Sequence, residues 1–230
     1  MVDKSPARVR EMFDDISPTY DLLNHVLSLN VDVIWRRRAA ELCAAPHDAL
    51  DVCSGTGDMA IELRRRWGGR VVGTDFAHEM LAIGDAKARR TAMPVEFLQA
   101  DTTCLPFETA TFDAVTVAFG IRNVADTAAG IREMTRVAKP GGRVVILEFT
   151  TPPNPLLRPA YLLYFTRILP MIGSIVSRSR HNAYSYLPES VAKWHAPDEL
   201  GRIMEGCSLQ DVRWELPTMG IAAIHVGIKS

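Results

Sequence analysis

The stretch DVCSGTGD, residues 51–58, joins a short apolar run to two glycines and two carboxylates. Gly55 and Gly57, together with Ala60, fit the pattern G-x-G-x-x-G/A, in which a tight turn brings backbone amides close to a nucleotide. Asp75 ends the next apolar run, at the position where an acid binds ribose hydroxyl groups. The spacing alone therefore favours a cofactor that contains a nucleotide.

Asp58 helps to decide which nucleotide-containing cofactor the turn binds. A dinucleotide places its pyrophosphate on the N-terminus of the helix after the turn, where free amides and the helix dipole attract an anion. A carboxylate in that first turn would repel the phosphates. S-adenosylmethionine has no phosphate, and its amino group and positively charged sulfonium both gain from nearby carboxylates such as Asp51 and Asp58. We therefore predict S-adenosylmethionine as the cofactor, with an NAD oxidoreductase as the weaker alternative.

Further residues complete the predicted cofactor site. Asp75 would bind the ribose hydroxyls, and Asp101, in QADTTCLPF, would face the adenine amine. Phe76 and Met80 would pack against the two faces of the ring. Each residue also has a structural interpretation, since Asp58 caps a helix well, strands often end in acids, and apolar residues usually belong to the core. Their order after successive strands is more specific than any one of them.

Other kinds of site find less support. No tyrosine is followed by lysine four residues later, so the proton relay of short-chain dehydrogenases is missing, and neither GxxxxGK[ST] nor HExxH occurs. The cysteines form no CxxC pair, which argues against a zinc site or a disulfide framework, and we predict no metal. They are Cys43, Cys53, Cys104 and Cys207.

The elements that must position these residues alternate between strand and helix. Strands are expected near ALDVCS, RVVGTD, VEFLQA, FDAVTVAF and GGRVVILEF, and their short apolar character suits a parallel sheet covered on both faces. The helix IREMTRVA should end at KPGG. Alternating apolar residues near 212–216 and 224–228 predict a closing antiparallel pair. The expected fold is a Rossmann-like α/β sheet, mostly parallel, with an antiparallel C-terminal strand.

Length and composition favour one domain. The chain has 230 residues, of which 47% are apolar and 23% charged, as in ordinary globular proteins. We expect N-terminal helices over residues 1–45, a cofactor-binding core over 46–150, an inserted helical cap over 151–196, and a closing helix and strands over 197–230.

Charge and hydropathy limit the partners. Lys and Arg total 26 against 27 Asp and Glu, a net charge of -1, so no overall field attracts nucleic acid. The N-terminus lacks the apolar core of a secretory signal, and the apolar run 161–176 is interrupted by Arg167 and Pro170. We expect a cytoplasmic protein that does not cross a bilayer.

Several longer stretches of the sequence resemble those of a known protein family. With YDLLNHVLSLNVDVIWRR before the fold, FGIRNV after its fourth strand and KPGGRVVILEF at its fifth, the chain closely resembles the ubiquinone/menaquinone biosynthesis C-methyltransferases. The likeness extends to AYSYLPESV and the terminal GIAAIHVGIK. It implies a class I methyltransferase fold and methyl transfer from S-adenosylmethionine to a ring carbon of a polyprenylated demethylquinol.

The resemblance also implies site residues. Ala118 stands where relatives often have serine, and Asn30 where they often have glycine, although asparagine enters left-handed conformations readily. The positions that match cofactor contacts of the family are Thr56, Asp75, Asp101 and Thr102.

The resemblance further implies that Arg122 and Asn123, just beyond the fourth strand, hold the quinol oxygens and favour the phenolate. Arginine is a poor base because its guanidinium stays protonated, so we expect water or Tyr20 to relay the proton. His25 is another candidate base, because histidine is the residue type that most often exchanges protons in catalysis near neutral pH, and a structural histidine is the alternative interpretation.

The cap segment is basic as well as apolar. No acidic residue occurs between Glu148 and Glu189, while arginines punctuate the run. This composition suits a helix at an anionic membrane surface, the inner face of the membrane, or a flap over an isoprenoid tail, and a cap helix packed on the core is the alternative. A homodimer is also compatible with the sequence. The rival functions are methylation of a soluble phenol and non-catalytic cofactor binding in a quinone-synthesis assembly.

Overall fold

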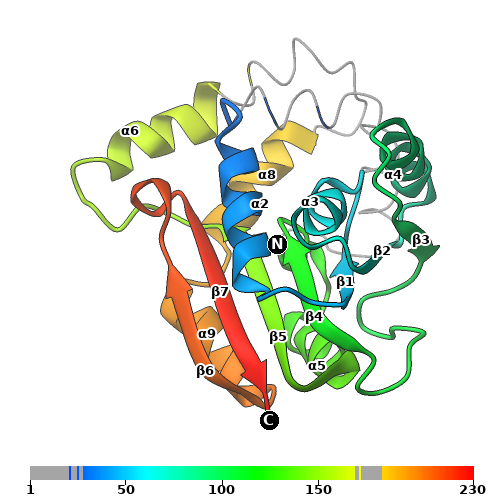
Figure 1. The fold of residues 1–230 in the computed structure, drawn as a ribbon. Helices are drawn as coiled ribbons and strands as arrows, with labels where there is room; N and C mark the ends of the chain where they lie inside the picture. Colours follow the sequence, from blue (N-terminus) through cyan, green and yellow to red (C-terminus); the bar gives the residue numbers. More distant parts are fainter. Residues whose placement is uncertain (1–20, 22–24, 26–27, 169–170, 172–182) are drawn as a thin grey trace.

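Strands from the whole length of the chain form one mixed sheet in the order β3-β2-β1-β4-β5-β7-β6. The computed structural model describes residues 21, 25, 28–168, 171 and 183–230 (Figure 1). Strands β1 to β5 run parallel, and β7 and β6 add as antiparallel strands. The strands are β1 (Asp48–Val52), β2 (Arg70–Asp75), β3 (Glu96–Gln99), β4 (Phe112–Ala118), β5 (Ala138–Phe149), β6 (Leu209–Glu215) and β7 (Ala222–Lys229).

The strand order confirms the predicted fold class. β1 pairs with β2 on one side and with β4 on the other. The strand order therefore runs outward from β1 to β3 on one side and from β4 to β5 on the other, and the switch point lies between β1 and β4. In sheets of this kind ligands bind outside the carboxyl ends of the strands, at the point where the order reverses. The glycine turn follows β1, and the stretch 119–123 follows β4. The fold therefore brings the two segments side by side at one edge of the sheet, since a Cβ at Gly120 would lie 2.3 Å from Cβ of Cys53.

Helices cover both faces of the sheet (Figure 1). One apolar cluster joins α2 and α3 to the sheet through residues such as Trp35 and Met59, and the other joins α5 and α9 through residues such as Met134 and Leu200. The helices of the core are α2 (Val31–Leu42), α3 (Asp58–Trp67), α4 (His78–Arg90), α5 (Thr127–Val137) and α9 (Pro197–Gly206).

Local sequence explains where these helices begin and end. Asn30 precedes α2 in the left-handed conformation (φ 60°), as predicted for an asparagine at that position. α3 ends at Gly68, also left-handed, and the carboxylate of Asp126 caps α5 by accepting a hydrogen bond from the amide of Ala129. α5 ends at Val137, one residue before the end of the predicted helix IREMTRVA and just ahead of KPGG, because Ala138 already belongs to β5.

The cap lies at the end of the sheet where the parallel strands finish (Figure 1). It contains α6 (Arg158–Leu163), a π-helical turn (Tyr164–Ile168) and α8 (Ala183–Ala192). Among the described residues, no helix combines the length and the apolar character that a bilayer span requires. The helix predicted over the first residues of the chain lies outside the described part.

Candidate cofactor and substrate site

The glycine turn after β1 is held by the acid that ends β2. The amide of Gly55 donates to Asp75 Oδ2 at 2.9 Å, and the amide of Ala77 donates to Oδ1 at 2.9 Å. Gly55 and Gly57 both have positive φ, 53° and 81°. A Cβ at Gly57 would lie 2.7 Å from Cζ of Phe97, so this turn needs glycine both for its conformation and for its packing.

Asp51 is a buried acid at the end of β1 with one oxygen available. Its side chain is 1% exposed, and Oδ1 accepts a hydrogen bond from Thr116 Oγ1 on β4 at 2.7 Å. Burial raises the pKa of Asp51 to about 7, against the opposing effects of the Thr116 hydroxyl and the charge of Arg36. A carboxylate of this kind gains strongly from a cation that enters the site.

Three buried oxygens near the glycine turn have no hydrogen-bond partner among the described residues: Asp51 Oδ2, Ser54 Oγ and Thr74 Oγ1. Buried polar atoms without partners are uncommon because each loses its water without replacement. Among the described residues other than its own chain neighbours, none has an atom within 4 Å of the place where a Cβ of Gly55 would stand. Acceptors, hydroxyls and open space over a glycine turn fit the amino group and ribose of S-adenosylmethionine.

Asp58, at the start of α3, is surrounded by cations of the protein itself. Its carboxylate lies 2.7 Å from Lys87 Nζ, 3.7 Å from Arg36 Nη2 and 3.6 Å from His25 Nε2. Burial acts to raise the pKa of Asp58, but the charges of Arg36 and Lys87 outweigh it and hold the pKa below its ordinary value. Because these side chains already neutralise much of the negative charge of Asp58, less of it is left to attract a cationic cofactor. The contact between Asp58 and the cofactor stays a prediction.

The same ion pairs connect the N-terminal part of the chain to the glycine turn. Asp21 accepts a hydrogen bond from Thr56 Oγ1 at 2.5 Å and pairs with Lys87 at 2.5 Å. His25 Nδ1 lies 2.9 Å from Asp32 Oδ2, and its other ring nitrogen faces Asp58. Both nitrogens of His25 thus face carboxylates, which favours the structural interpretation of this histidine over a role as base.

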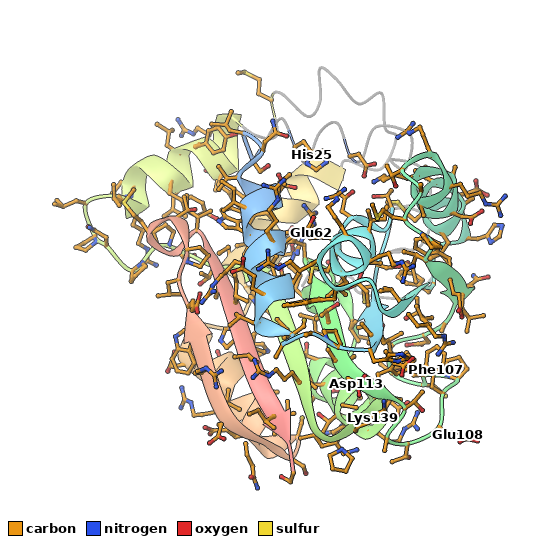
Figure 2. All side chains as sticks on the ribbon, viewed as in Figure 1. His25, Glu62, Phe107, Glu108, Asp113 and Lys139 are labelled. Atoms are coloured by element: carbon orange, nitrogen blue, oxygen red, sulfur yellow. The ribbon has the colours of Figure 1, made fainter. Side chains whose placement is uncertain are left out.

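A second group of histidine and carboxylates lies elsewhere. His47, Asp48 and Asp113 come together, and Lys139 Nζ contacts Asp113 at 2.7 Å. Figure 2 shows Asp113 and Lys139 at the opposite end of the sheet from His25. This group therefore lies away from the predicted cofactor residues.

The predicted adenine contacts are spread around the ends of β2 and β3. Phe76 is half-buried, while Met80 is fully buried in the manner of a core residue. Asp101 is exposed, and its Oδ1 accepts hydrogen bonds from the amide and the hydroxyl of Thr103. Thr102 is buried, with its hydroxyl 3.2 Å from Cys53 Sγ. The structure thus brings Asp101 and Phe76 to the surface of this region but not Met80.

Arg122 lies in the 3₁₀ turn Ile121–Asn123 after β4, with its guanidinium buried. Nη1 donates to Glu148 Oε1 at 2.5 Å and to the carbonyl of Phe119 at 2.6 Å, and Nε points to Ser190 Oγ at 3.4 Å. The guanidinium carbon lies 5.6 Å from the ring centroid of Phe149. Nη2 donates no hydrogen bond to the part of the chain that the structure describes. The two N–H groups of Nη2 can therefore donate hydrogen bonds to a ligand.

Glu148 is the residue that sequence reasoning missed. It is 1% exposed at the end of β5, and its carboxylate also accepts from the amide of Phe149 at 2.9 Å. Burial raises the pKa of Glu148, and the nearby Arg122 acts against that rise. An acid at the end of the apolar run RVVILEF, where a parallel strand meets its ligand crevice, was the available signal.

The other predicted residues have separate positions. Asn123 is buried beside Arg122, and Ala118 is half-buried at the end of β4. Tyr20, the predicted relay for the proton, lies outside the described residues. The carboxyl edge of the parallel strands thus carries Asp51, the glycine turn and Asp75 after β1 and β2, and Arg122 and Asn123 after β4.

Known proteins match the chain over nearly its full length. The profile of the ubiE/COQ5 methyltransferase family matches residues 1–229. A demethylmenaquinone methyltransferase of Thermus thermophilus is 49% identical, with 94% of this chain and 99% of that protein covered. A ubiquinone/menaquinone biosynthesis C-methyltransferase UbiE of Geobacter sulfurreducens is 43% identical, with 96% of this chain and 88% of that protein covered.

A solved structure shares the fold. An S-adenosylmethionine-dependent methyltransferase of Thermotoga maritima, described as a possible histamine N-methyltransferase, superposes with a TM-score of 0.67 over 96% of this chain and 99% of that chain. At 14% identity this likeness bears on the fold alone. The match of sequence and fold leads to one conclusion: the chain belongs to the ubiE/COQ5 methyltransferase family and is an S-adenosylmethionine-dependent C-methyltransferase.

Proposed function

We propose that the protein methylates a ring carbon of a polyprenylated demethylquinol. The full-length likeness to a demethylmenaquinone methyltransferase supports this substrate class. The observation that carries the proposal is a buried cation, Arg122, in the turn after β4, whose Nη2 has no hydrogen-bond partner among the described residues. A buried guanidinium suits a planar substrate that must carry negative charge on a ring oxygen.

The residues around the glycine turn hold the cofactor, which supplies an electrophilic methyl group on a positively charged sulfur. Asp51 binds the amino group with the oxygen that has no partner in the described chain, and Asp75 binds the ribose. The hydroxyls of Ser54 and Thr74 add polar contacts. The remaining residues that we assign to the cofactor are Gly55, Thr56, Gly57, Asp58, Phe76, Asp101, Thr102 and Ala118.

Arg122 and Asn123 hold the oxygens of the reduced ring. Loss of a proton from the quinol hydroxyl makes the neighbouring ring carbon electron-rich, and the arginine stabilises the resulting phenolate. When bound, the cofactor would supply its methyl group to that carbon, and the ring hydrogen on the carbon would leave as a proton. Holding the reacting atoms in line can contribute roughly 7–11 kcal/mol to lowering the barrier. Water or Tyr20 carries the hydroxyl proton away.

The test supplies methyl-labelled S-adenosylmethionine to the purified protein with reduced demethylmenaquinol and, in parallel, with the reduced demethylated ubiquinol precursor. Label in the lipid phase with one quinol is the expected result, and it identifies the ring. Measurable cofactor binding without label in either quinol would overturn the proposal and favour a soluble phenol or a non-catalytic function.

The segment 151–196 caps the substrate site, and we place it at the inner face of the membrane. Apolar side chains on it are exposed, with Leu156 at 86% and Met171 at 58%, beside the exposed cations Arg158 and Arg167. Exposed apolar and basic side chains together favour an anionic lipid surface. A substrate with a polyprenyl tail resides in such a membrane.

Binding to vesicles tests this surface. The native protein should co-sediment with anionic liposomes at low salt, and Leu156→Glu should weaken that binding about tenfold, the effect of losing one buried leucine. Leu98→Glu, at an exposed leucine on β3, is the matched control and should bind like the native protein. No sedimentation of the native protein at low salt, or equal losses in both variants, would contradict the membrane contact.

A further inference from the structure

Tyr161, on α6, has a buried hydroxyl without a hydrogen-bond partner among the described residues. The residue is 8% exposed, so water does not replace the missing partner. Leaving a hydroxyl in this state destabilises a folded protein, and phenylalanine would fill the same space without that loss. An unsatisfied phenol next to a substrate site therefore indicates a polar ligand.

The surroundings of Tyr161 connect it to Arg122. Its ring stacks on that of Phe165, with ring centroids 5.1 Å apart and ring planes at 20°. The ring centroids of Phe165 and Phe149 are 6.0 Å apart. The guanidinium of Arg122 lies over the same Phe149 ring. Burial raises the pKa of Tyr161, and the positive charge of Arg122 opposes that rise, so the phenol lies within the electrostatic range of the guanidinium.

The protonation state of Tyr161 decides what it can do. Because burial disfavours the phenolate, the hydroxyl keeps its proton at neutral pH and acts as a donor. Arg122 Nη2 is also a donor group without a partner in the described chain. Two donors on one aromatic cluster suit a single oxygen that becomes negatively charged.

We propose that Tyr161 is a further catalytic residue, whose hydroxyl donates a hydrogen bond to the quinol oxygen that Arg122 also holds. The inference rests on the proposed function, because that oxygen belongs to the demethylquinol. As the quinol loses its proton, the bond from Tyr161 strengthens and stabilises the phenolate. The cap thus contributes to the chemistry as well as covering the substrate.

The test compares Tyr161→Phe with Tyr164→Phe, which removes the hydroxyl of the half-buried tyrosine three residues further along. Three quantities are measured for each variant: kcat with the demethylquinol, the dissociation constant of S-adenosylmethionine, and the midpoint of thermal unfolding. Tyr161→Phe should lower kcat about 10- to 100-fold, as for one hydrogen bond to a charged oxygen. Its cofactor affinity should not change, and its unfolding midpoint should stay the same or rise. Tyr164→Phe should resemble the native protein in kcat and in cofactor affinity.

The outcomes separate the inference from the function on which it rests. No methylation of any demethylquinol by the native protein would overturn both. A native protein that methylates the quinol while Tyr161→Phe keeps the same kcat would overturn the inference alone. A fall in the unfolding midpoint together with kcat would also overturn it, because the hydroxyl would then be structural. Equal losses of kcat in the two variants would do the same.

Discussion

Replacing Arg122 with alanine is expected to lower the turnover of the demethylquinol by about 10²- to 10³-fold, the loss that follows removal of one donor aimed at a developing oxyanion. Among the described residues, Nη1 of Arg122 is held by Glu148 and by the carbonyl of Phe119, and Nε by Ser190, so Nη2 is the nitrogen left for a ligand. The cofactor residues lie at the glycine turn, so the dissociation constant of S-adenosylmethionine should change less than about threefold. Steady-state rates and cofactor titrations measure both, with Arg132→Ala, at an exposed arginine on α5, as control.

The same substitution leaves the carboxylate of Glu148 buried without its cation. Breaking a buried pair in this way typically lowers the free energy of unfolding by roughly 3–5 kcal/mol. Without Arg122 the pKa of Glu148 rises further, so the folded variant holds a proton that the unfolded chain has lost. Stability is then present at low pH and falls as the pH rises through the folded pKa.

A double variant separates stability from catalysis. Adding Glu148→Gln to Arg122→Ala removes the unpaired charge, so the unfolding midpoint should recover at neutral pH while turnover stays low. Recovery of turnover in the double variant would show that Arg122 acts only through folding, and it would end the proposed role in holding the quinol.

Replacing Asp51 with asparagine should weaken S-adenosylmethionine binding by about 100-fold, the order of magnitude for losing one partner of a buried charge pair. Asparagine keeps an acceptor for the hydroxyl of Thr116, so the end of β1 should keep its structure. Calorimetric titration measures the affinity. Asp113→Asn, at the opposite end of the sheet, is the matched control and should bind the cofactor like the native protein.

The pH dependence of binding sharpens this prediction. Asp51 has a pKa of about 7 in the protein without ligand, and only its ionised form attracts the amino group. Below pH 7 the carboxylate must first lose its proton, so affinity should fall by up to about tenfold per pH unit, and above pH 7 this dependence should level off. Asp51→Asn should lack it. A parallel slope in both proteins would exclude Asp51 as the titrating group.

Asp51 also affects stability in a defined direction. Its folded pKa is raised from 3.8 to about 7, so between these values the folded state holds a proton that the unfolded chain has released. Stability therefore decreases as the pH rises through this range. Without cofactor, Asp51→Asn should unfold at a higher temperature than the native protein at pH 8, and saturating cofactor should reduce the difference.

The fold, and the positions of the acids and glycines at the ends of its strands, could be predicted from local sequence. Short apolar runs between helices with clear ends predict a parallel sheet, and the order of Asp51, the glycine turn and Asp75 follows from neighbouring strands ending at one edge. The left-handed Asn30 and the end of α5 before KPGG were likewise predictable, because backbone conformation at such positions depends on a few adjacent residues.

The partners of the charged residues could not be predicted in this way. The cations that neutralise Asp58 are not its neighbours along the chain. Arg36 and Lys87 reach it from other helices. Met80 was expected at the adenine ring and lies in the core, because apolar burial depends on the whole packing of a helix rather than on its place after a strand.

The sequence by itself determined the sheet, the edge at which ligands bind and the family to which the chain belongs, because these depend on periodicity, turn residues and motifs that lie close together along the chain. Only the tertiary structure decided that Arg122 pairs with Glu148, that Asp51 keeps an oxygen without a partner among the described residues, and that the hydroxyl of Tyr161 is buried. Arg122 and Glu148 are 26 positions apart, and such pairs and burials follow from packing that no local pattern records.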